Sequence, residues 1–371
     1  MEEQRIELLA TAPGQSTHLR VLRFGRSGAG PKAMIQAALH ADEVPPMLVA
    51  QQLRARLLQL EAEQALLGEV VLVPYANPLG LAQRVLGDVQ GRFDLHDGVN
   101  FNRAYADLGP AVANAVGTRL GRDAKANAAL IRDTLLAAAR ALSAQTPAQD
   151  LKRRLLQLAA DCELVLDLHC DAQAAMHVYA LTPQADIACE LGALLGARAV
   201  LLATESGESP FDEACSRPWL HLQQQFPGAA VPLGCFSATV ELRGEADTHH
   251  TLAAQDADAL IEFLRRCGVV AGPLAPLPAA LCQATPLSAS EPVSAPCAGV
   301  VVFHREPGET VAAGDLIADI VDIDSGKLTP LNALSSGVLY ARAARRWAGA
   351  GDRVAKIAGT SLQRSGRLLG P

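Results

Sequence analysis

Three residues, in two segments of the chain, have the types and positions of metal ligands. His40 and Glu43 lie three residues apart, after an apolar run and before a helical pattern, so their side chains can converge on one metal ion. His169 lies in the apolar residues 166–170, which places its imidazole near the end of a strand. The alternatives are a glutamate that stabilises a helix N-terminus and a core histidine with one backbone hydrogen bond.

Two carboxylates in apolar strands could serve such a site. Asp167 precedes His169 by two residues, on the same face of its strand, where it could orient the imidazole. Glu241 lies within the apolar residues 239–242, and a buried carboxylate is costly unless it has a partner or a task. Beside a metal ion it would take a proton from bound water. The alternative is an exposed side chain on an alternating edge strand.

Residues 77–110 carry polar groups suited to substrate binding. This segment contains Gly, Asn, Asp and Pro without a clear period, which predicts a long loop of the kind that often has a function. The pair Asn102-Arg103 offers an amide and a guanidinium fork for a carboxylate. Arg84 and Arg92 lie upstream in the same loop, and ordinary surface arginine is the alternative for at least one of them.

The elements that must position these residues alternate between strands and helices. Strands are expected over residues 5–10, 18–24, 32–39, 69–75, 162–170, 176–181, 198–203 and 237–242. Helices are expected over residues 45–67, 123–160 with a break near 146, 183–195, 211–226 and 249–266. This alternation predicts a layered α/β domain with a parallel or mixed sheet, whose ligands gather beyond the strand ends.

The C-terminal part of the chain differs in composition. Residues 271–296 hold six of the 22 prolines and are expected to form a linker between a domain at 1–270 and a second domain at 297–371. Residues 307–317 and 349–357 are two similar phrases in which a Gly-Asp turn precedes an apolar strand. This pattern resembles a small β barrel-sandwich domain of the lipoyl or biotinyl type.

Composition excludes several classes of protein. The 371 residues are 50% hydrophobic and 19% charged, with a net charge of −7, so the chain can bury a large core and lacks a basic nucleic-acid footprint. No apolar run reaches the length of a membrane span, and the acidic N-terminus does not resemble a signal peptide. The eight scattered cysteines form no C-x-x-C pair, so we expect a cytoplasmic protein with reduced thiols.

The order of these motifs resembles the zinc carboxypeptidase superfamily, and within it the succinylglutamate desuccinylase/aspartoacylase family. The resemblance covers residues 30–265 and includes Asn77-Pro78 ahead of the arginine-containing loop. It implies a zinc-carboxypeptidase-like α/β domain with a mixed sheet, and the barrel-sandwich tail also occurs in this broad family. Three positions depart from the family pattern: Ala38 and Ala41 replace glycines, and Asn100 replaces an acidic residue.

The resemblance implies a role for each candidate residue. His40, Glu43 and His169 would bind one Zn²⁺ per chain, and Glu241 would be the general base. The substrate's carboxylate would lie on the Asn102-Arg103 pair. Arg92, or alternatively Arg84, would polarise the scissile carbonyl.

The expected activity is hydrolysis of the amide bond of an N-acyl amino acid or a related small carboxylate. This is a deacylase reaction on a linear amide other than a peptide bond, with a metal-bound water as nucleophile. The alternatives are a zinc carboxypeptidase or amidase that acts on short peptides, and a non-catalytic binding protein with the same fold. The expected partner is a small molecule, without nucleic acid or membrane, and the apolar composition is compatible with a homo-oligomer.

Overall fold

Apolar, β-branched runs form the centre of a nine-stranded mixed sheet in the computed structural model, which describes residues 1–370. The strand order is β1-β2-β4-β3-β7-β11-β9-β10-β12. The bounds are β1 Glu2–Glu7, β2 His18–Gly25, β3 Lys32–Ala37, β4 Glu69–Val73, β7 Leu164–Asp171, β9 His177–Leu181, β10 Ala199–Ala203, β11 Phe236–Gly244 and β12 Ala284–Pro286. The neighbours β4, β3, β7 and β11 run parallel, and β9 is antiparallel to β11.

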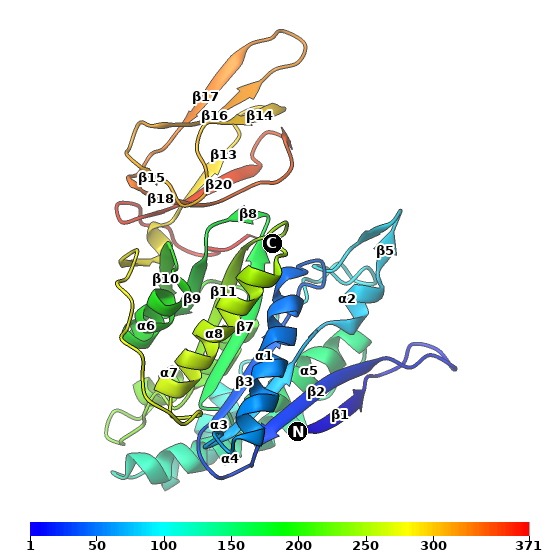
Figure 1. The fold of residues 1–371 in the computed structure, drawn as a ribbon, viewed down its shortest axis with the longest axis vertical. Helices are drawn as coiled ribbons and strands as arrows, with labels where there is room; N and C mark the ends of the chain where they lie inside the picture. Colours follow the sequence, from blue (N-terminus) through cyan, green and yellow to red (C-terminus); the bar gives the residue numbers. More distant parts are fainter. Residues whose placement is uncertain (371) are drawn as a thin grey trace.

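Helices cover both faces of this sheet (Figure 1). One face is covered by α1 Pro45–Ala62, α6 Ala185–Leu195 and α8 His250–Arg266. The other face is covered by α3 Gly109–Val116, α4 Ala124–Ala141, α5 Pro147–Ala159 and α7 Phe211–Gln225. Each face buries its own hydrophobic cluster, so the sheet is apolar on both sides, as expected for central parallel strands. No helix within residues 1–370 is both long and apolar enough to cross a membrane.

Local sequence signals explain where the helices begin. Pro45 and Pro46 occupy the first turn of α1, where a missing N–H costs nothing. The break expected near residue 146 separates α4 from α5, and the Thr146 side chain caps α5 by accepting the N–H of Gln149. The expected long loop is more structured than the sequence indicated, because it contains α2 Pro78–Ala82, the hairpin of β5 Arg84–Val85 and β6 Asp88–Val89, and the start of α3.

The C-terminal part forms two further sheets that pack together. One contains β13 Glu291–Ser294, β20 Arg353–Gly359, β18 Gly337–Arg342 and β15 Thr310–Val311, and the other contains β17 Leu328–Asn332, β16 Leu316–Val321, β14 Gly299–Phe303 and β19 Trp347–Ala348. Side chains from both sheets, including Val301, Ile320 and Ile357, enclose one hydrophobic cluster. The predicted fold class, a mixed-sheet α/β domain followed by a β part, is confirmed.

The two parts of the chain are joined by strand pairing and by the proline-rich segment. β8 Gln173–Ala174, which directly follows β7, pairs with β18, and Figure 1 shows the C-terminal sheets at this end of the large sheet. Residues 271–296, expected as a linker, contribute β12 to the large sheet and β13 to a C-terminal sheet. The carboxyl ends of β3, β7 and β11 therefore face a region that the C-terminal part partly covers.

Candidate metal centre and active site

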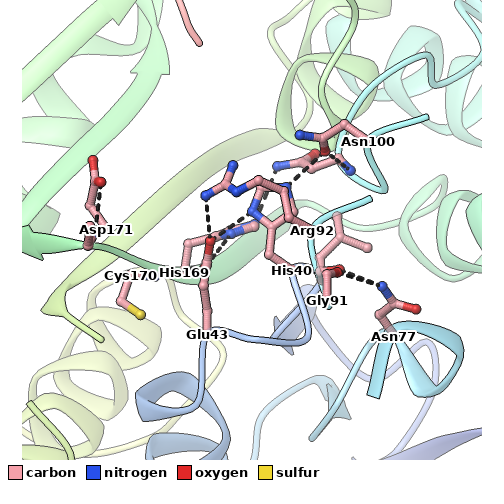
Figure 2. A network of polar contacts seen from close by, with 12 residues as sticks. His40, Glu43, Asn77, Gly91, Arg92, Asn100, His169, Cys170 and Asp171 are labelled. Atoms are coloured by element: carbon pink, nitrogen blue, oxygen red, sulfur yellow. Dashed lines mark hydrogen bonds and ion pairs between the residues drawn. The ribbon is translucent and has the colours of Figure 1, made fainter. Parts of the chain in front are cut away.

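The three candidate metal ligands lie together at the carboxyl ends of two adjacent parallel strands. His40 and Glu43 lie in the turn between β3 and α1, and His169 lies on β7. Nδ1 of His40 lies 2.8 Å from Oε1 of Glu43, and Nδ1 of His169 lies 2.8 Å from Oε2 of the same carboxylate (Figure 2). The three ligand atoms lie within 4.8 Å of one another, and all three residues are buried. The group could hold a metal ion.

The chemistry of this group fits a divalent cation. Two imidazoles and one carboxylate form the donor set of catalytic zinc sites, in which a fourth position stays open. Burial lowers the pKa of His40 to about 4, and the nearby Arg92 guanidinium acts in the same direction, so its imidazole is neutral as a metal ligand must be. Burial opposes ionisation of Glu43, but the two imidazoles hold the pKa of its carboxyl well below the usual value.

Each histidine is oriented through its second ring nitrogen. His169 Nε2 lies 2.9 Å from Asp167 Oδ2, and Gln36 donates to the other oxygen of Asp167 at 3.0 Å. His40 Nε2 lies 2.9 Å from the side-chain oxygen of Asn100. These contacts turn both Nδ1 atoms toward Glu43, which is how outer partners fix the tautomer and ring angle of metal-binding histidines. The expected contact between Asp167 and the His169 imidazole is present.

The loop after β4 is fastened to the turn that carries His40. Asn77 caps α2 by accepting the N–H of Gly80, and its amide donates to the carbonyl of Leu39 at 3.0 Å. The carbonyl of Gly91 accepts the N–H of Ala41 at 3.1 Å. A Cβ at Gly91 would lie 2.1 Å from the nitrogen of Asp42, so only glycine allows this approach. The next residue, Arg92, is thereby held beside the metal ligands, where Nη2 lies 3.1 Å from Glu43.

The pair Asn102-Arg103 lies on the same cavity. Asn102 places its amide nitrogen 3.3 Å from Nε2 of His169, and its side-chain oxygen accepts the N–H of Phe211 at 2.8 Å. Arg103 donates to the carbonyl of Gly370 at 2.8 Å and lies 3.5 Å from the Glu208 carboxylate. Both residues line the cavity beside His40 and His169.

Glu241 lies opposite His169 in the register of β11 and β7, and it lines the cavity. β11 lies between β7 and β9, so the alternative of an exposed edge strand is excluded. Its Oε2 atom is shielded from solvent and has no hydrogen-bond partner among residues 1–370. Burial and the negative charge of Glu43 raise the pKa of Glu241 to about 8. A cation held beside it would favour the ionised form that a general base requires.

The cavity has a volume of about 210 Å³. Six of the predicted site residues line it: His40, Arg92, Asn102, Arg103, His169 and Glu241. Glu43 lies behind the two histidines as their shared partner. Arg84 is not brought to the site: it lies on β5, away from the cavity lining, and its guanidinium donates to the carbonyl of Gly87. Of the two upstream arginines, the structure brings Arg92 to the candidate metal ligands.

Four charged residues of the cavity were not anticipated: Asp171, Asp212, Glu213 and Lys356. Lys356 lies on β20 of the C-terminal part and pairs with Asp171 at 2.5 Å. Asp171 follows His169 by two residues, so the alternation of β7 could have indicated it. Lys356 comes from a distant part of the sequence, and no local pattern connects it with the site.

The fold and the His-Glu-His group define an α/β protein with a candidate metal-dependent hydrolase site. Residues 29–267 match the family model of the succinylglutamate desuccinylase/aspartoacylase catalytic domain. The chain belongs to this family, which confirms the resemblance seen in its motifs. A comparison with curated proteins found no match.

Solved structures share the fold over nearly the whole chain. A succinylglutamate desuccinylase/aspartoacylase family protein from Shewanella amazonensis is 28% identical, with a TM-score of 0.85 and coverage of 96% of this chain and 98% of that chain. One from Shewanella frigidimarina is 24% identical, with a TM-score of 0.85 and coverage of 98% and 99%. The product-bound ectoine utilization protein EutE (DoeB) from Ruegeria pomeroyi is 18% identical, with a TM-score of 0.68 and coverage of 97% and 95%.

Proposed function

We propose that the chain is a zinc-dependent amidohydrolase that removes the acyl group from an N-acyl amino acid or a related small carboxylate. The observation that carries this proposal is the gathering of the His40, Glu43 and His169 ligand atoms within 4.8 Å of one another. They adjoin a cavity that is also lined by Glu241 and Arg103. The family to which the chain belongs supports the same class of reaction.

The chain's own residues would do the following work. Glu241 takes a proton from the attacking water and passes it to the leaving amine. Arg92 donates to the carbonyl oxygen as negative charge develops there. Asn102 and Arg103 hold a free carboxylate of the substrate and so fix its register. When bound, zinc supplies a Lewis acid and lowers the pKa of water toward about 7.

The small volume of the cavity supports a small substrate over a peptide. The cavity of about 210 Å³ is lined in part by Lys356 of β20 and by Leu369 and Gly370 near the C-terminus. We infer that these groups limit the length of substrate that the cavity can accept. We propose residues 1–270 as the hydrolase domain, 271–296 as its connection and 297–371 as a β domain that narrows the entrance.

The test combines metal content with turnover. Elemental analysis should find one zinc per chain in the wild type and little zinc in His169→Ala. The control His177→Gln changes a buried histidine outside the ligand group and should keep the metal. Glu241→Gln should also keep zinc but lose at least a hundredfold in kcat on N-acetyl and N-succinyl amino acids. The exposed Glu63→Gln serves as its control.

Each outcome separates the proposal from its alternatives. Faster cleavage of C-terminal residues from short peptides than of N-acyl amino acids would favour a carboxypeptidase. Zinc binding without turnover on either panel would favour a binding protein of the same fold. Undiminished activity in Glu241→Gln would exclude this residue as the general base.

A further inference from the structure

The first turn of α7 contributes two acidic side chains to the wall of the cavity. Asp212 and Glu213 both line it and are 8% and 7% exposed. A helix N-terminus favours acidic residues, which explains why carboxylates are tolerated here. It does not explain why Asp212 faces the cavity without an ion pair.

The cationic side chains of the cavity already have carboxylate partners. Arg92 lies 3.1 Å from Glu43, Arg103 lies 3.5 Å from Glu208, and Lys356 lies 2.5 Å from Asp171. A ligand with a second negative group would therefore have to compete with a protein carboxylate. The longest of these three distances, 3.5 Å, belongs to Arg103, which is the arginine proposed to bind the α-carboxylate.

Of the two acidic side chains of α7, Asp212 is less well compensated than Glu213. Glu213 accepts the N–H of Ser206 with one oxygen at 2.7 Å, and its other oxygen lies 3.6 Å from Nη1 of Arg217 without a hydrogen bond. Asp212 forms no ion pair within residues 1–370, and the backbone N–H of Glu213 and the nearby His169 imidazole act to lower the pKa of its carboxyl. Burial raises the pKa of Asp212 to about 7, with the charge of Glu213 acting in the same direction. A buried carboxylate without an ion pair costs free energy that a cationic ligand would offset.

The position of Asp212 relates it to one part of the substrate. The N–H of Phe211, the preceding residue, donates to the side chain of Asn102 at 2.8 Å, so the start of α7 is fastened to the expected carboxylate-binding pair. In an N-acyl amino acid, the α-carboxylate and the acylated nitrogen share one carbon atom. With the carboxylate on Arg103 and the amide at the metal ligands, the side chain is the remaining group that can reach the wall formed by α7.

We propose that Asp212, backed by Glu213, determines specificity by binding an ammonium or guanidinium group on the side chain of the substrate's amino acid half. This inference rests on the proposed function and narrows its substrate class to N-acylated basic amino acids. Asp212 is a binding residue and takes no part in the proton transfers. The hydroxyl-bearing Ser216, which lies one turn further along α7 and also lines the cavity, widens the polar surface available to such a group.

Matched substrates test this directly on the zinc-loaded, full-length protein. Nα-acetyl-L-lysine and Nα-acetyl-L-norleucine differ only in the terminal ammonium, and Nα-acetyl-L-ornithine with Nα-acetyl-L-norvaline gives the shorter pair. We expect kcat/KM to favour the cationic substrate of each pair at least tenfold.

Asp212→Asn should lower kcat/KM for the cationic substrates at least tenfold and change kcat/KM for the neutral substrates by less than threefold. Asp212→Glu should restore part of the preference. Asp186→Asn, at the exposed first turn of α6, is the control.

Binding measured without turnover separates this inference from the proposed reaction. Calorimetry with free L-lysine, L-norleucine and L-glutamate on Glu241→Gln should show tighter binding of lysine that is lost in Glu241→Gln/Asp212→Asn. If lysine binds in this way but no N-acyl substrate is hydrolysed, the proposed reaction is contradicted and the binding role of Asp212 stands. Hydrolysis with a preference for norleucine or glutamate, or an equal loss on both substrates in Asp212→Asn, would overturn the role of Asp212 and keep the reaction.

Discussion

Asn100 and His40 are joined by a hydrogen bond in which the Asn100 side-chain oxygen accepts from Nε2 of the imidazole at 2.9 Å. The same oxygen accepts the backbone N–H of Asn102 at 2.7 Å, so one amide group orients a metal ligand and shapes the substrate-binding turn. The family pattern has an acidic residue at this position. An amide keeps the acceptor but removes the negative charge that would make the imidazole a stronger donor to a metal.

Metal affinity should therefore depend on residue 100 in two directions. Asn100→Ala removes the acceptor and should weaken zinc binding about 10- to 100-fold, whereas Asn100→Asp should strengthen it. Competition with a chromogenic chelator measures both changes. Asn127→Ala is the matched control, because that buried asparagine bonds to backbone atoms of Gly121 and Ala230. Equal zinc affinity in wild type and Asn100→Ala would show that the hydrogen bond does not tune the ligand.

Much of the site could be predicted because its residues interrupt apolar strands. A histidine or glutamate inside an apolar run is conspicuous, and strand ends in one parallel sheet meet at one edge, so His169 and Glu241 were expected near His40. The strand positions were also largely correct, since β-branched runs such as that of β4 form strands for local reasons.

The residues that escaped prediction are held by contacts between distant segments. Lys356 reaches Asp171 across 185 positions of the sequence, and no periodicity encodes that approach. Asp212 follows an ordinary rule for helix starts, so its sequence position could not distinguish a capping role from a ligand-binding one. Arg84 and Arg92 lie in the same loop, and only the family resemblance placed Arg92 ahead of Arg84. In the structure they are separated by the close approach of Gly91 to the turn after His40.

Ala38 adopts a backbone conformation that favours glycine, with φ of 56°. This is one of the two positions where the family pattern has glycine. Ala38→Gly removes steric strain of about 1 kcal/mol but adds a similar entropic cost in the unfolded chain, so stability should change by less than about 1 kcal/mol. Ala38→Val should destabilise by about 2 kcal/mol or more, because a β-branched residue is poorly tolerated there.

Urea unfolding of the two Ala38 variants measures these differences. Ala37→Gly, one residue earlier in β3 with ordinary strand geometry, is the control and should cost about 1 kcal/mol. If Ala38→Gly is as destabilising as Ala37→Gly, the left-handed conformation at residue 38 carries no strain.

Stability should fall in mildly acidic solution because His177 is buried in its neutral form. Burial lowers the pKa of His177 to about 4, although the Asp171 carboxylate acts in the opposite direction. The unfolded imidazole, with a pKa of about 6.5, takes up a proton that the folded one does not, so stability is lost as the pH falls from about 6.5 toward 4. Between pH 7 and pH 5 this contribution is about 2 kcal/mol.

Chemical unfolding of wild type and His177→Gln at both pH values isolates this effect. Glutamine does not titrate, so the variant should lose about 2 kcal/mol less than the wild type when the pH is lowered from 7 to 5. His18→Gln, at an exposed histidine, should behave as the wild type does. A loss in His177→Gln equal to that of the wild type would assign the acid sensitivity to other groups.

The ion pair between Lys356 and Asp171 should fasten the C-terminal sheets to the metal-binding part of the chain. Its two atoms are 2.5 Å apart, and it lies beside the pairing of β8 with β18. Lys356→Met leaves the half-buried Asp171 carboxylate without its cation, which should cost about 1 to 2 kcal/mol. Because the loss falls on the contact between the two parts, proteolysis near residues 271–283 should accelerate before global unfolding.

The double variant Lys356→Met/Asp171→Asn should recover part of the lost stability, since neither charge is then left unpaired. Lys327→Met, at an exposed turn, should change neither quantity. Equal protease resistance in Lys356→Met and wild type would show that the β8–β18 pairing holds the two parts together without this ion pair.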